Sequence, residues 1–173
     1  MAGVLTGCAL LEKDEIVLSV TSPDGDMVAY VTKFNPCIDD PCQKLWLKQD
    51  RERKPVLLEK LYDDQRWCDE IKWSPNGQKV AFLIMQKYLY IYEAAGPTLF
   101  RKVDLVPDSE GYPPNPRATD FSFNADSKTV RFTETEYEYV LDTRKNKWNR
   151  LNPKLKIREI DIEEKVETEK SPT

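Results

Sequence analysis

Residues 73–82 read WSPNGQKVAF, and related segments occur at two other places in the chain. They align without gaps with TSPDGDMVAY at 21–30 and with the looser copy FNADSKTVRF at 123–132. The copies follow one another after 52 and then 50 positions. A nearly constant period of this length is typical of proteins built from one repeated supersecondary unit. The sequence therefore predicts three copies of one structural unit.

Each copy combines a tight turn with the start of a strand. Proline presets φ at the first central position of a turn, and Asp-Gly or Asn-Gly supplies the residue with positive φ. Such turns usually join two antiparallel strands. After each turn, apolar residues alternate and are expected to share one face of a strand. These residues are Val28 and Tyr30, Val80 and Phe82, and Val130 and Phe132. The third copy has Ala-Asp-Ser in place of Pro-Asn-Gly, which suits a terminal or less regular unit.

Two further strands are expected in each unit, because short runs rich in aromatic and aliphatic residues follow every copy. These runs lie at 44–47 and 56–58, at 88–92 and 99–103, and at 137–141 and 147–148. Three units of four strands predict an all-β chain, with no long helix before Leu151.

The second copy, followed by LYIY at 89–92, resembles a blade of the TolB-like β-propellers. Repeats of that family carry a Ser-Pro-Asp-Gly turn between their first two strands and an aromatic-aliphatic third strand. The resemblance covers residues 16–151 and implies a partial β-propeller of three four-stranded antiparallel blades. The expected boundaries are an N-terminal tail at 1–15, blades at about 16–60, 69–104 and 118–151, and a charged C-terminal tail at 152–173. Within that tail, residues 154–162 are expected to add an edge strand to a neighbour.

Three blades are fewer than the roughly four to eight that close a propeller. Three arrangements remain open: two chains close one ring with two-fold symmetry, another protein caps an open arc, or the units form a closed threefold barrel or prism. In the first two, an isolated chain would expose a larger apolar patch than a monomer tolerates. A protein partner or a second copy is therefore expected, with a homodimer or a subunit of a larger complex as the result.

The composition excludes most enzyme classes. The 173 residues contain no histidine, which removes Ser-His-Asp and Cys-His nucleophile systems and His-ligated zinc and haem. No glycine-rich phosphate loop is present. The 26 basic and 30 acidic residues leave a net charge of −4, which disfavours nucleic acid as a partner. We therefore expect no enzymatic activity, no cofactor and no metal. A carboxylate-based enzyme resembling a glycosidase is the remaining enzymatic alternative.

Cys37 and Cys42 are the closest pair among the four cysteines. The prolines and the Asp-Asp pair around them favour a turn that brings the two Cα atoms within disulfide range. We expect a disulfide, which implies an oxidising compartment. The alternatives are two reduced thiols or a metal site completed by Cys8 and Cys68.

The segment Leu5-Thr6-Gly7-Cys8 resembles the cleavage box of bacterial lipoproteins. In that family the cysteine carries lipid, so the resemblance implies a membrane tether through Cys8. The protein would then lie in the bacterial cell envelope, as a periplasmic or membrane-anchored lipoprotein. The preceding residues hold no basic region and no apolar run, so this interpretation requires a longer start. The alternative is a cytoplasmic protein in which Cys8 is a plain thiol.

The candidate ligand or partner contacts lie in the connections between units. The propeller resemblance implies that the segment before the first strand of a blade faces the top or the central channel, where ligands usually bind. The candidates are the polar and aromatic residues of these segments and of the proline-rich loop at 106–117: Asp64, Trp67, Asp69, Glu70, Tyr112 and Asp120. The carboxylates would bind a cation or a basic partner. Solvated acids and a semi-rigid connector are the alternatives.

The function expected is a non-enzymatic protein–protein interaction scaffold, acting in a homo-oligomer or a larger envelope assembly. The alternative is a carbohydrate- or small-ligand-binding protein that stacks its ligand on Trp46, Trp73, Trp148 and the tyrosines of 88–92. Core packing between blades is the competing explanation for these aromatic residues, because most of them occupy alternating strand positions.

Overall fold

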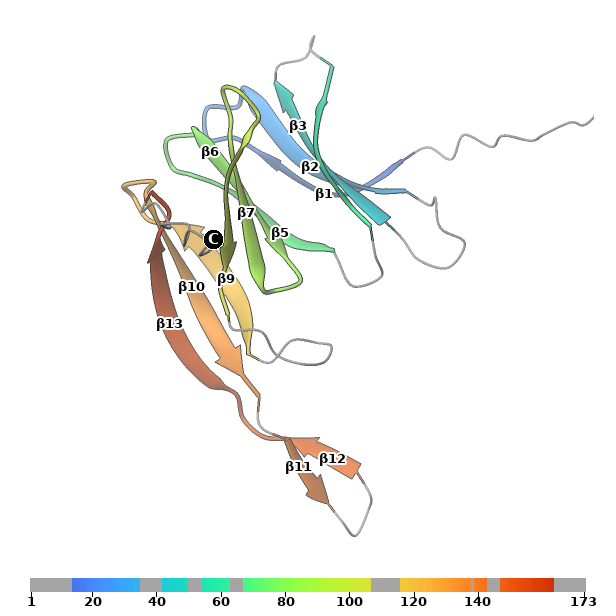
Figure 1. The fold of residues 1–173 in the computed structure, drawn as a ribbon, viewed down its shortest axis with the longest axis vertical. Helices are drawn as coiled ribbons and strands as arrows, with labels where there is room; N and C mark the ends of the chain where they lie inside the picture. Colours follow the sequence, from blue (N-terminus) through green and yellow to red (C-terminus); the bar gives the residue numbers. More distant parts are fainter. Residues whose placement is uncertain are drawn as a thin grey trace, which may run out of the picture.

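Figure 1 shows the fold in a computed structural model of the chain. The structure describes residues 14–34, 42–49, 54–62, 67–106, 116–137, 139–142 and 147–163. The regular elements among these residues are all β-strands, paired in antiparallel sheets. Within this part of the chain, no helix has the length and apolar character needed to span a membrane. The all-β expectation is confirmed.

The first two units each form a four-stranded antiparallel meander, as the repeat predicts. The first sheet holds β1 (Glu15–Thr21), β2 (Met27–Phe34), β3 (Cys42–Gln49) and β4 (Val56–Leu61). The second sheet holds β5 (Cys68–Trp73), β6 (Lys79–Ile84), β7 (Tyr88–Glu93) and β8 (Leu99–Asp104). In both sheets the strands lie side by side in chain order.

The third sheet has a different set of strands from the one expected. It contains β9 (Arg117–Phe123), β10 (Thr129–Glu136) and β13 (Lys154–Asp161), in the order β13-β10-β9. Among the described strands, β11 (Tyr139–Asp142) and β12 (Lys147–Arg150) pair only with each other. The expectation that these two strands complete the third blade was therefore wrong. Strand β13 takes the third place, beyond the expected blade end at 151, while the other expected boundaries stay predictions.

Cross-strand charges explain why β13 matches β10. In the register, Glu134 lies opposite Lys156, and Glu136 lies opposite Lys154. The Arg158 Nε atom also donates to the Glu134 carboxylate at 2.8 Å. Opposite charges directly across two strands stabilise the pairing. The residues expected to add an edge strand thus form the edge strand β13 of the third sheet, and their charges fit it to β10.

The repeated turn has one geometry in all three copies. Each carries a short backbone hydrogen bond across the turn, from Gly25 N to Ser22 O at 3.0 Å, from Gly77 N to Ser74 O at 2.9 Å, and from Ser127 N to Asn124 O at 2.9 Å. The donor residue has positive φ in every copy, at 85° for Gly25, 70° for Gly77 and 59° for Ser127. The predicted turn is confirmed even in the third copy, where a serine takes the conformation that favours glycine.

Replacing Ser127 with glycine is expected to change the free energy of unfolding by less than about 1 kcal/mol, because a gain and two losses nearly cancel. Glycine removes the cost of a left-handed backbone conformation, about 1–2 kcal/mol for a non-glycine residue. It also gains freedom in the unfolded chain, and it loses the hydroxyl that accepts a hydrogen bond from the backbone N of Asn76. As the matched control, Gly77→Ala should lower stability by about 1 kcal/mol, because it adds the strain without removing a hydroxyl. Urea denaturation measures both changes, and a Ser127→Gly protein that loses more than the Gly77→Ala protein would contradict the strain argument.

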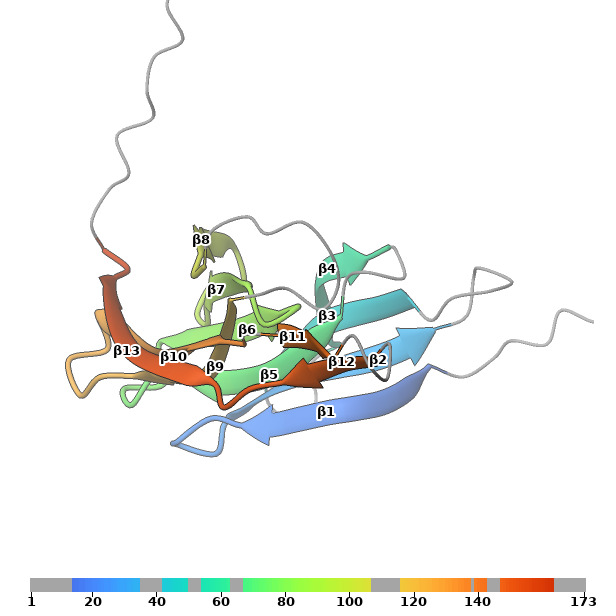
Figure 2. The ribbon, with the colours of Figure 1, turned by 90° about the horizontal axis from the view of Figure 1, so that it is seen from below.

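Two apolar layers hold the three sheets together. Figures 1 and 2 show how the three sheets are arranged, in two views. The first layer joins the first and second sheets through the fully buried Ala29, Val31 and Phe82, among others. The second layer joins the second and third sheets through residues such as Leu83 and Phe132. The middle sheet is therefore covered on both faces, which explains the almost unbroken apolar runs of β6 and β7.

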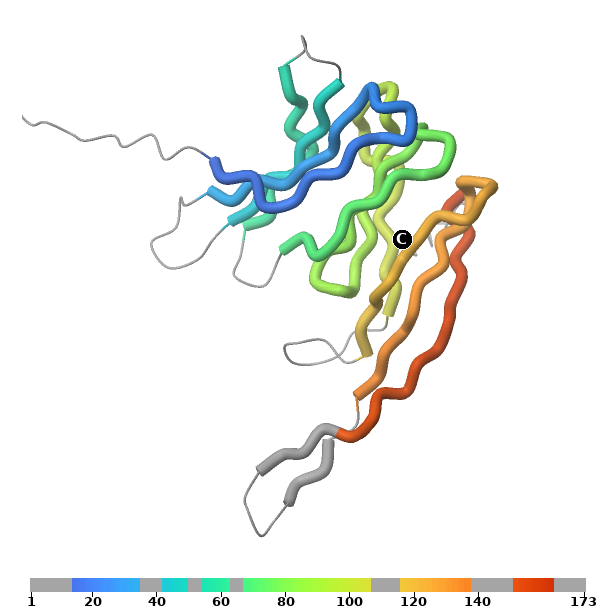
Figure 3. Tube along the Cα trace, turned by 180° about the vertical axis from the view of Figure 1, so that it is seen from behind, coloured from blue at the N-terminus to red at the C-terminus, as the bar shows by residue number. Residues whose placement is uncertain are grey.

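The first strand of each sheet lies closest to the neighbouring sheets. Strand β5 contacts both β1 and β9, and Figure 3 shows it running between them. The Trp73 indole Nε1 at the end of β5 donates to the backbone carbonyl of Val20 in β1 at 3.0 Å. At the same end, the backbone N of Asn76 donates to the Ser127 hydroxyl at 3.4 Å. The sheets are therefore arranged as blades around their first strands.

Candidate interaction surfaces

Asp69 and Trp67, two of the predicted contacts, bond directly to each other. Asp69 lies at the bulge of β5 and accepts hydrogen bonds from the Trp67 Nε1 at 2.8 Å and the Gln86 backbone N at 2.7 Å. Burial raises the pKa of the Asp69 carboxyl above its ordinary value, and the two hydrogen bonds act in the opposite direction. Met85 and Gln86 both have positive φ, so the carboxylate holds the tight turn between β6 and β7. A ligand role for the pair stays a prediction.

Asp69→Ala is expected to lower the free energy of unfolding by about 1.5–3 kcal/mol, because it removes a charged acceptor shared by two hydrogen bonds. Glu70→Ala is the matched control. The Glu70 carboxylate pairs with the Lys72 ammonium at 2.8 Å, and both side chains remain about one-third exposed, so its loss should cost less than about 1 kcal/mol. Thermal or urea unfolding compares the two variants, and equal costs would contradict a turn-holding role for Asp69.

The remaining predicted contacts are not brought together by the described structure. Asp120 is exposed in the bulge of β9, with φ of 52°. Its neighbour Phe121 lies under the Lys72 ammonium, 5.3 Å from the ring centroid. Asp64 and Tyr112 lie outside the described residues. No group of three or more His, Cys, Asp or Glu side chains in the described part of the chain is placed to hold a metal ion.

Two of the four cysteines, Cys8 and Cys37, lie outside the described residues. Cys42 is buried at the start of β3, and Cys68 is buried at the start of β5. Burial raises the pKa of the Cys68 thiol, whose Sγ donates to the Glu70 carbonyl at 3.4 Å. A buried thiol of raised pKa is poorly reactive. The disulfide and the lipid on Cys8 stay predictions.

The face of the first sheet that points away from the second sheet carries aromatic and cationic side chains. We call it the first outer face; it includes Val28, Tyr30, Phe34, Lys44, Trp46, Lys48, Leu57 and Lys60. Tyr30 stacks on Trp46, with ring centroids 6.1 Å apart and planes 10° apart. The Trp46 Nε1 donates to the Thr32 hydroxyl at 2.8 Å. The Lys44 ammonium lies 4.3 Å from the Phe34 ring centroid and pairs with Asp14 at 2.7 Å.

The repeat shows what covers the equivalent positions in the other two sheets. Val80 and Phe82 are fully buried against the first sheet, and Phe132 is buried against the second. Their counterparts Val28 and Tyr30 are only half-buried, since no described sheet lies on the first outer face. Sequence reasoning placed these residues on one face but did not identify that face as an interaction surface. The alternation of apolar residues is the same in all units, so it does not show which face is exposed. The first outer face is exposed because its sheet lies at the end of the stack.

The opposite end of the stack has a different character. We call the face of the third sheet that points away from the second sheet the second outer face; it includes Arg131, Thr133, Leu155, Ile157 and Glu159. Leu155 is 67% exposed and Ile157 is 59% exposed. Arg131 stands where the repeat has the buried Ala29 and Ala81. This face combines aliphatic side chains with charges of both signs.

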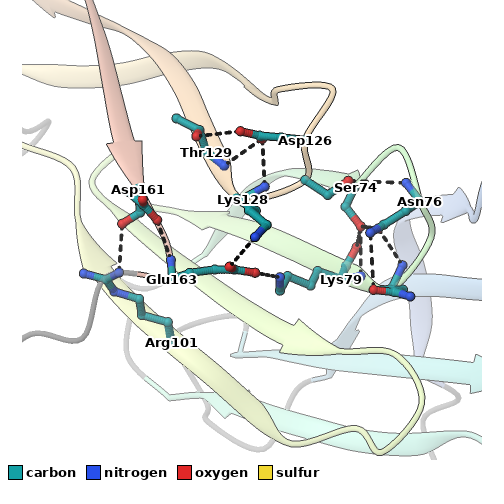
Figure 4. Close-up of polar contacts among 11 residues, drawn as sticks. Ser74, Asn76, Lys79, Arg101, Asp126, Lys128, Thr129, Asp161 and Glu163 are labelled. Atoms are coloured by element: carbon teal, nitrogen blue, oxygen red, sulfur yellow. Dashed lines mark hydrogen bonds and ion pairs between the residues drawn. The ribbon is translucent and has the colours of Figure 1, made fainter.

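A groove of about 500 Å³ lies at the turn end, between the first and second sheets. Amide, apolar and charged side chains line it, among them Met27, Asn76, Lys79, Phe100 and Glu163. Figure 4 shows the Glu163 side chain, from the segment after β13, reaching between Lys79 and Lys128. The Glu163 carboxylate pairs with Lys79 at 3.0 Å and with Lys128 at 3.2 Å, and these contacts hold its pKa below the usual range. The groove is thus lined by the first two sheets, their turns and the segment that follows β13.

The aromatic residues considered for sugar stacking separate into two environments. Trp73 is buried in the first apolar layer, so the core-packing explanation is confirmed for it. Tyr90 and Tyr92 are buried there as well. Trp46 remains partly exposed on the first outer face, while the surroundings of the Trp148 side chain lie outside the described residues.

Comparisons with known proteins identify relatives in structure only. No protein-family model and no curated protein matches the chain. The apo AtxE2 isopeptidase matches with a TM-score of 0.59 at 12% identity, over 87% of this chain and 29% of that one. The periplasmic gluconolactonase PpgL of Pseudomonas aeruginosa matches with a TM-score of 0.45 at 13% identity, over 82% and 41%. The Cps50 (Swd1) β-propeller domain of Myceliophteria thermophila matches with a TM-score of 0.44 at 13% identity, over 69% and 35%.

The fold class is all-β, with three blade-like antiparallel sheets as in a partial β-propeller. In the part of the chain that the structure describes, two of these sheets have four strands and the third has three. The chain spans less than half the length of each of these solved structures. At sequence identities this low, the similarity concerns the fold alone. The activity of each similar protein is not transferred to this chain.

Proposed function

We propose that the chain is a non-enzymatic scaffold for protein–protein contact, of the TolB-like propeller type. The observation that carries this proposal is the first outer face. Its residues Val28 and Tyr30 occupy positions that the other two sheets bury completely, yet they remain half-exposed. An ordered aromatic face of this kind is typical of a surface that a protein covers.

The arrangement of the aromatic side chains supports the same proposal. The stack of Tyr30 on Trp46 and the hydrogen bond from Trp46 to Thr32 order the face before any partner binds. An ordered face loses less conformational entropy on binding than a flexible one. Tyrosine and tryptophan are also enriched among the residues that dominate binding energy in interfaces.

The proposal includes a location in the bacterial envelope. The Leu5–Cys8 box supports it, because lipid on that cysteine would tether the scaffold to a membrane, and the Cys37–Cys42 disulfide would suit the same compartment. Intact-mass measurement of the protein purified from its source tests the tether. A mass increase located on Cys8 supports it, and an unmodified Cys8 within the intact chain contradicts it.

Affinity capture with matched variants tests the scaffold function. The wild-type chain, Trp46→Glu and Leu99→Glu are immobilised and exposed to an extract of the source cells. Leu99 is 50% exposed on β8 of the middle sheet and lies on neither outer face. A protein retained by the wild type and Leu99→Glu but lost with Trp46→Glu supports the proposal. If Trp46→Glu retains every protein, including copies of the chain, as well as the wild type does, the proposal is wrong.

Small-ligand binding is a second candidate, favoured by the groove at the turn end. The amides of Asn76 and Gln78 and the ring of Phe100 line it, and such groups recognise sugars through hydrogen bonds and stacking. Calorimetry with a panel of mono- and oligosaccharides tests this candidate. Binding that Phe100→Ala abolishes supports it, and no heat change with any sugar argues against it.

A further inference from the structure

We propose that the first outer face packs on the second outer face of another copy of this chain, so that two chains close one ring of six sheets. The inference rests on the proposed interaction function and names the partner and the surfaces. The sequence already allowed a ring closed by two chains with two-fold symmetry. The structure adds which side chains would form each contact in that ring.

The two interfaces inside the chain are directional. Each of the first two sheets turns a small aliphatic face toward the sheet that follows it, with Ala29 and Val31 in β2 and Ala81 and Leu83 in β6. In β10 the equivalent positions hold Arg131 and Thr133. The following sheet meets that face with a valine and an aromatic residue, as Phe82 and Phe132 do. An interface between copies that continues this series joins the third sheet of one chain to the first sheet of the other. Such a contact joins two unlike faces. Repeating it gives a closed ring when the rotations between successive chains add up to a full turn.

The placement of the sheets supports closure. The first strands β1, β5 and β9 lie next to one another, and the two neighbouring pairs of turns meet at one end. Gly77 lies against the side chain of Asp24 in the first turn, where an added Cβ would meet Oδ2 at 3.5 Å, and Asn76 bonds to Ser127 in the third. Three sheets from each of two chains make six, within the range of roughly four to eight in which propellers close.

The chemistry of the two outer faces is complementary. The first outer face presents aromatic rings and the lysines Lys44, Lys48 and Lys60, and no carboxylate among the described residues pairs with Lys48 or Lys60. The second outer face presents exposed aliphatic side chains and the carboxylate of Glu159. Arg131 lies opposite Glu159 in the register, so this face carries charges of both signs. The Glu159 carboxylate would suit the lysines, and a guanidinium stacks well on aromatic rings such as those of Tyr30 and Trp46.

Two alternative pairings of copies fit these faces less well. If two first outer faces met, Lys48 and Lys60 of one chain would approach the same lysines of the other, and like charges in an interface are unfavourable. Lys44 adds little to this repulsion, because it pairs with Asp14. If two second outer faces met, the aromatic first outer face would remain uncovered on both chains. Only the contact between unlike faces covers both kinds of exposed apolar side chain at once.

The experiment measures the mass of the full chain in solution by light scattering over a range of concentrations. The wild type is expected at twice the chain mass of 20.1 kDa. Leu57→Glu alters the first outer face, where Leu57 is 38% exposed, and Ile157→Lys alters the second. Each variant alone is expected at the mass of one chain, because every interface in its ring carries the substitution. Circular dichroism confirms that each remains folded, and Leu99→Glu, altered on neither face, should remain a dimer.

Mixing the two variants separates this inference from its rivals. In a ring of one chain of each kind, one interface is free of substitutions. The other interface brings together the two introduced side chains, a carboxylate and an ammonium of opposite charge, so the mixture should regain the two-chain mass. A wild type with the mass of one chain at every concentration overturns the inference, and so does a dimer that Ile157→Lys leaves intact. The scaffold proposal survives either result if the capture experiment retains a different protein through Trp46.

Discussion

Phe82→Ala is expected to lower the free energy of unfolding by about 3–5 kcal/mol, the usual cost of removing a buried phenylalanine side chain. Phe82 is fully buried in the first apolar layer, where its ring meets Tyr92 edge-on with centroids 5.8 Å apart. The middle sheet is held by both layers, so its surroundings cannot collapse easily into the space left behind. The midpoint of urea denaturation, with the slope of the transition, gives the change.

Tyr30→Ala is the matched comparison, because Tyr30 holds the same place in the first unit that Phe82 holds in the second. Tyr30 is only half-buried, so its removal from a single chain should cost about 1–2 kcal/mol. The measurement uses protein dilute enough to be monomeric. Equal costs at the two positions would show that the first outer face is covered within the chain itself, contrary to the structure.

A chain that ends at Leu151 is expected to lose at least about 3 kcal/mol of stability and to unfold without a sharp transition. The shortened chain lacks β13, which pairs with β10 along its whole length. It also lacks Ile162, which is 1% exposed in the second apolar layer and whose burial alone stabilises the fold by about 1.5–3 kcal/mol. Because natural domains are stable by only about 5–15 kcal/mol, this loss is a large share of the total.

A chain that ends at Glu163 is the control for this truncation. It keeps β13, Ile162 and the ion pairs from Glu163 to Lys79 and Lys128, so its thermal unfolding midpoint should match that of the full chain. Circular dichroism during heating compares the three proteins. A chain ending at Leu151 that unfolds as sharply and at the same temperature would show that β13 is dispensable to the third sheet.

The first two sheets could be predicted because their information is local. The Pro-Asp-Gly and Pro-Asn-Gly turns specify hairpins within a few residues, and the alternation after each turn specifies the buried face. The same turn forms in the third copy without proline or glycine, since the Asp126 carboxylate accepts hydrogen bonds from the backbone N of Lys128 and Thr129. That signal was present in the sequence as an aspartate two residues before Lys128.

The third sheet could not be predicted fully, because two candidates competed for one place. Residues 139–142 and 147–150 form a local hairpin, as their pattern indicates, yet the partner of β10 is β13, which lies farther along the chain. Pairing over a long separation depends on the match of charges and apolar residues between two strands. Propensity within each strand does not reveal such a match.

The candidate contact residues also separate into features that the sequence revealed and features that only the folded chain revealed. The sequence placed Asp69 and Trp67 before the first strand of a unit, but the tight turn that Asp69 holds lies 17 residues away along the chain. The alternation of Val28 and Tyr30 was readable, while their exposure follows from the absence of a described sheet beside the first one. Turns and strand faces were therefore readable from the amino-acid sequence, because they arise from the conformational preferences of neighbouring residues. Strand partners, buried carboxylates and uncovered faces emerged only in the folded chain, because they depend on contacts between residues far apart in sequence.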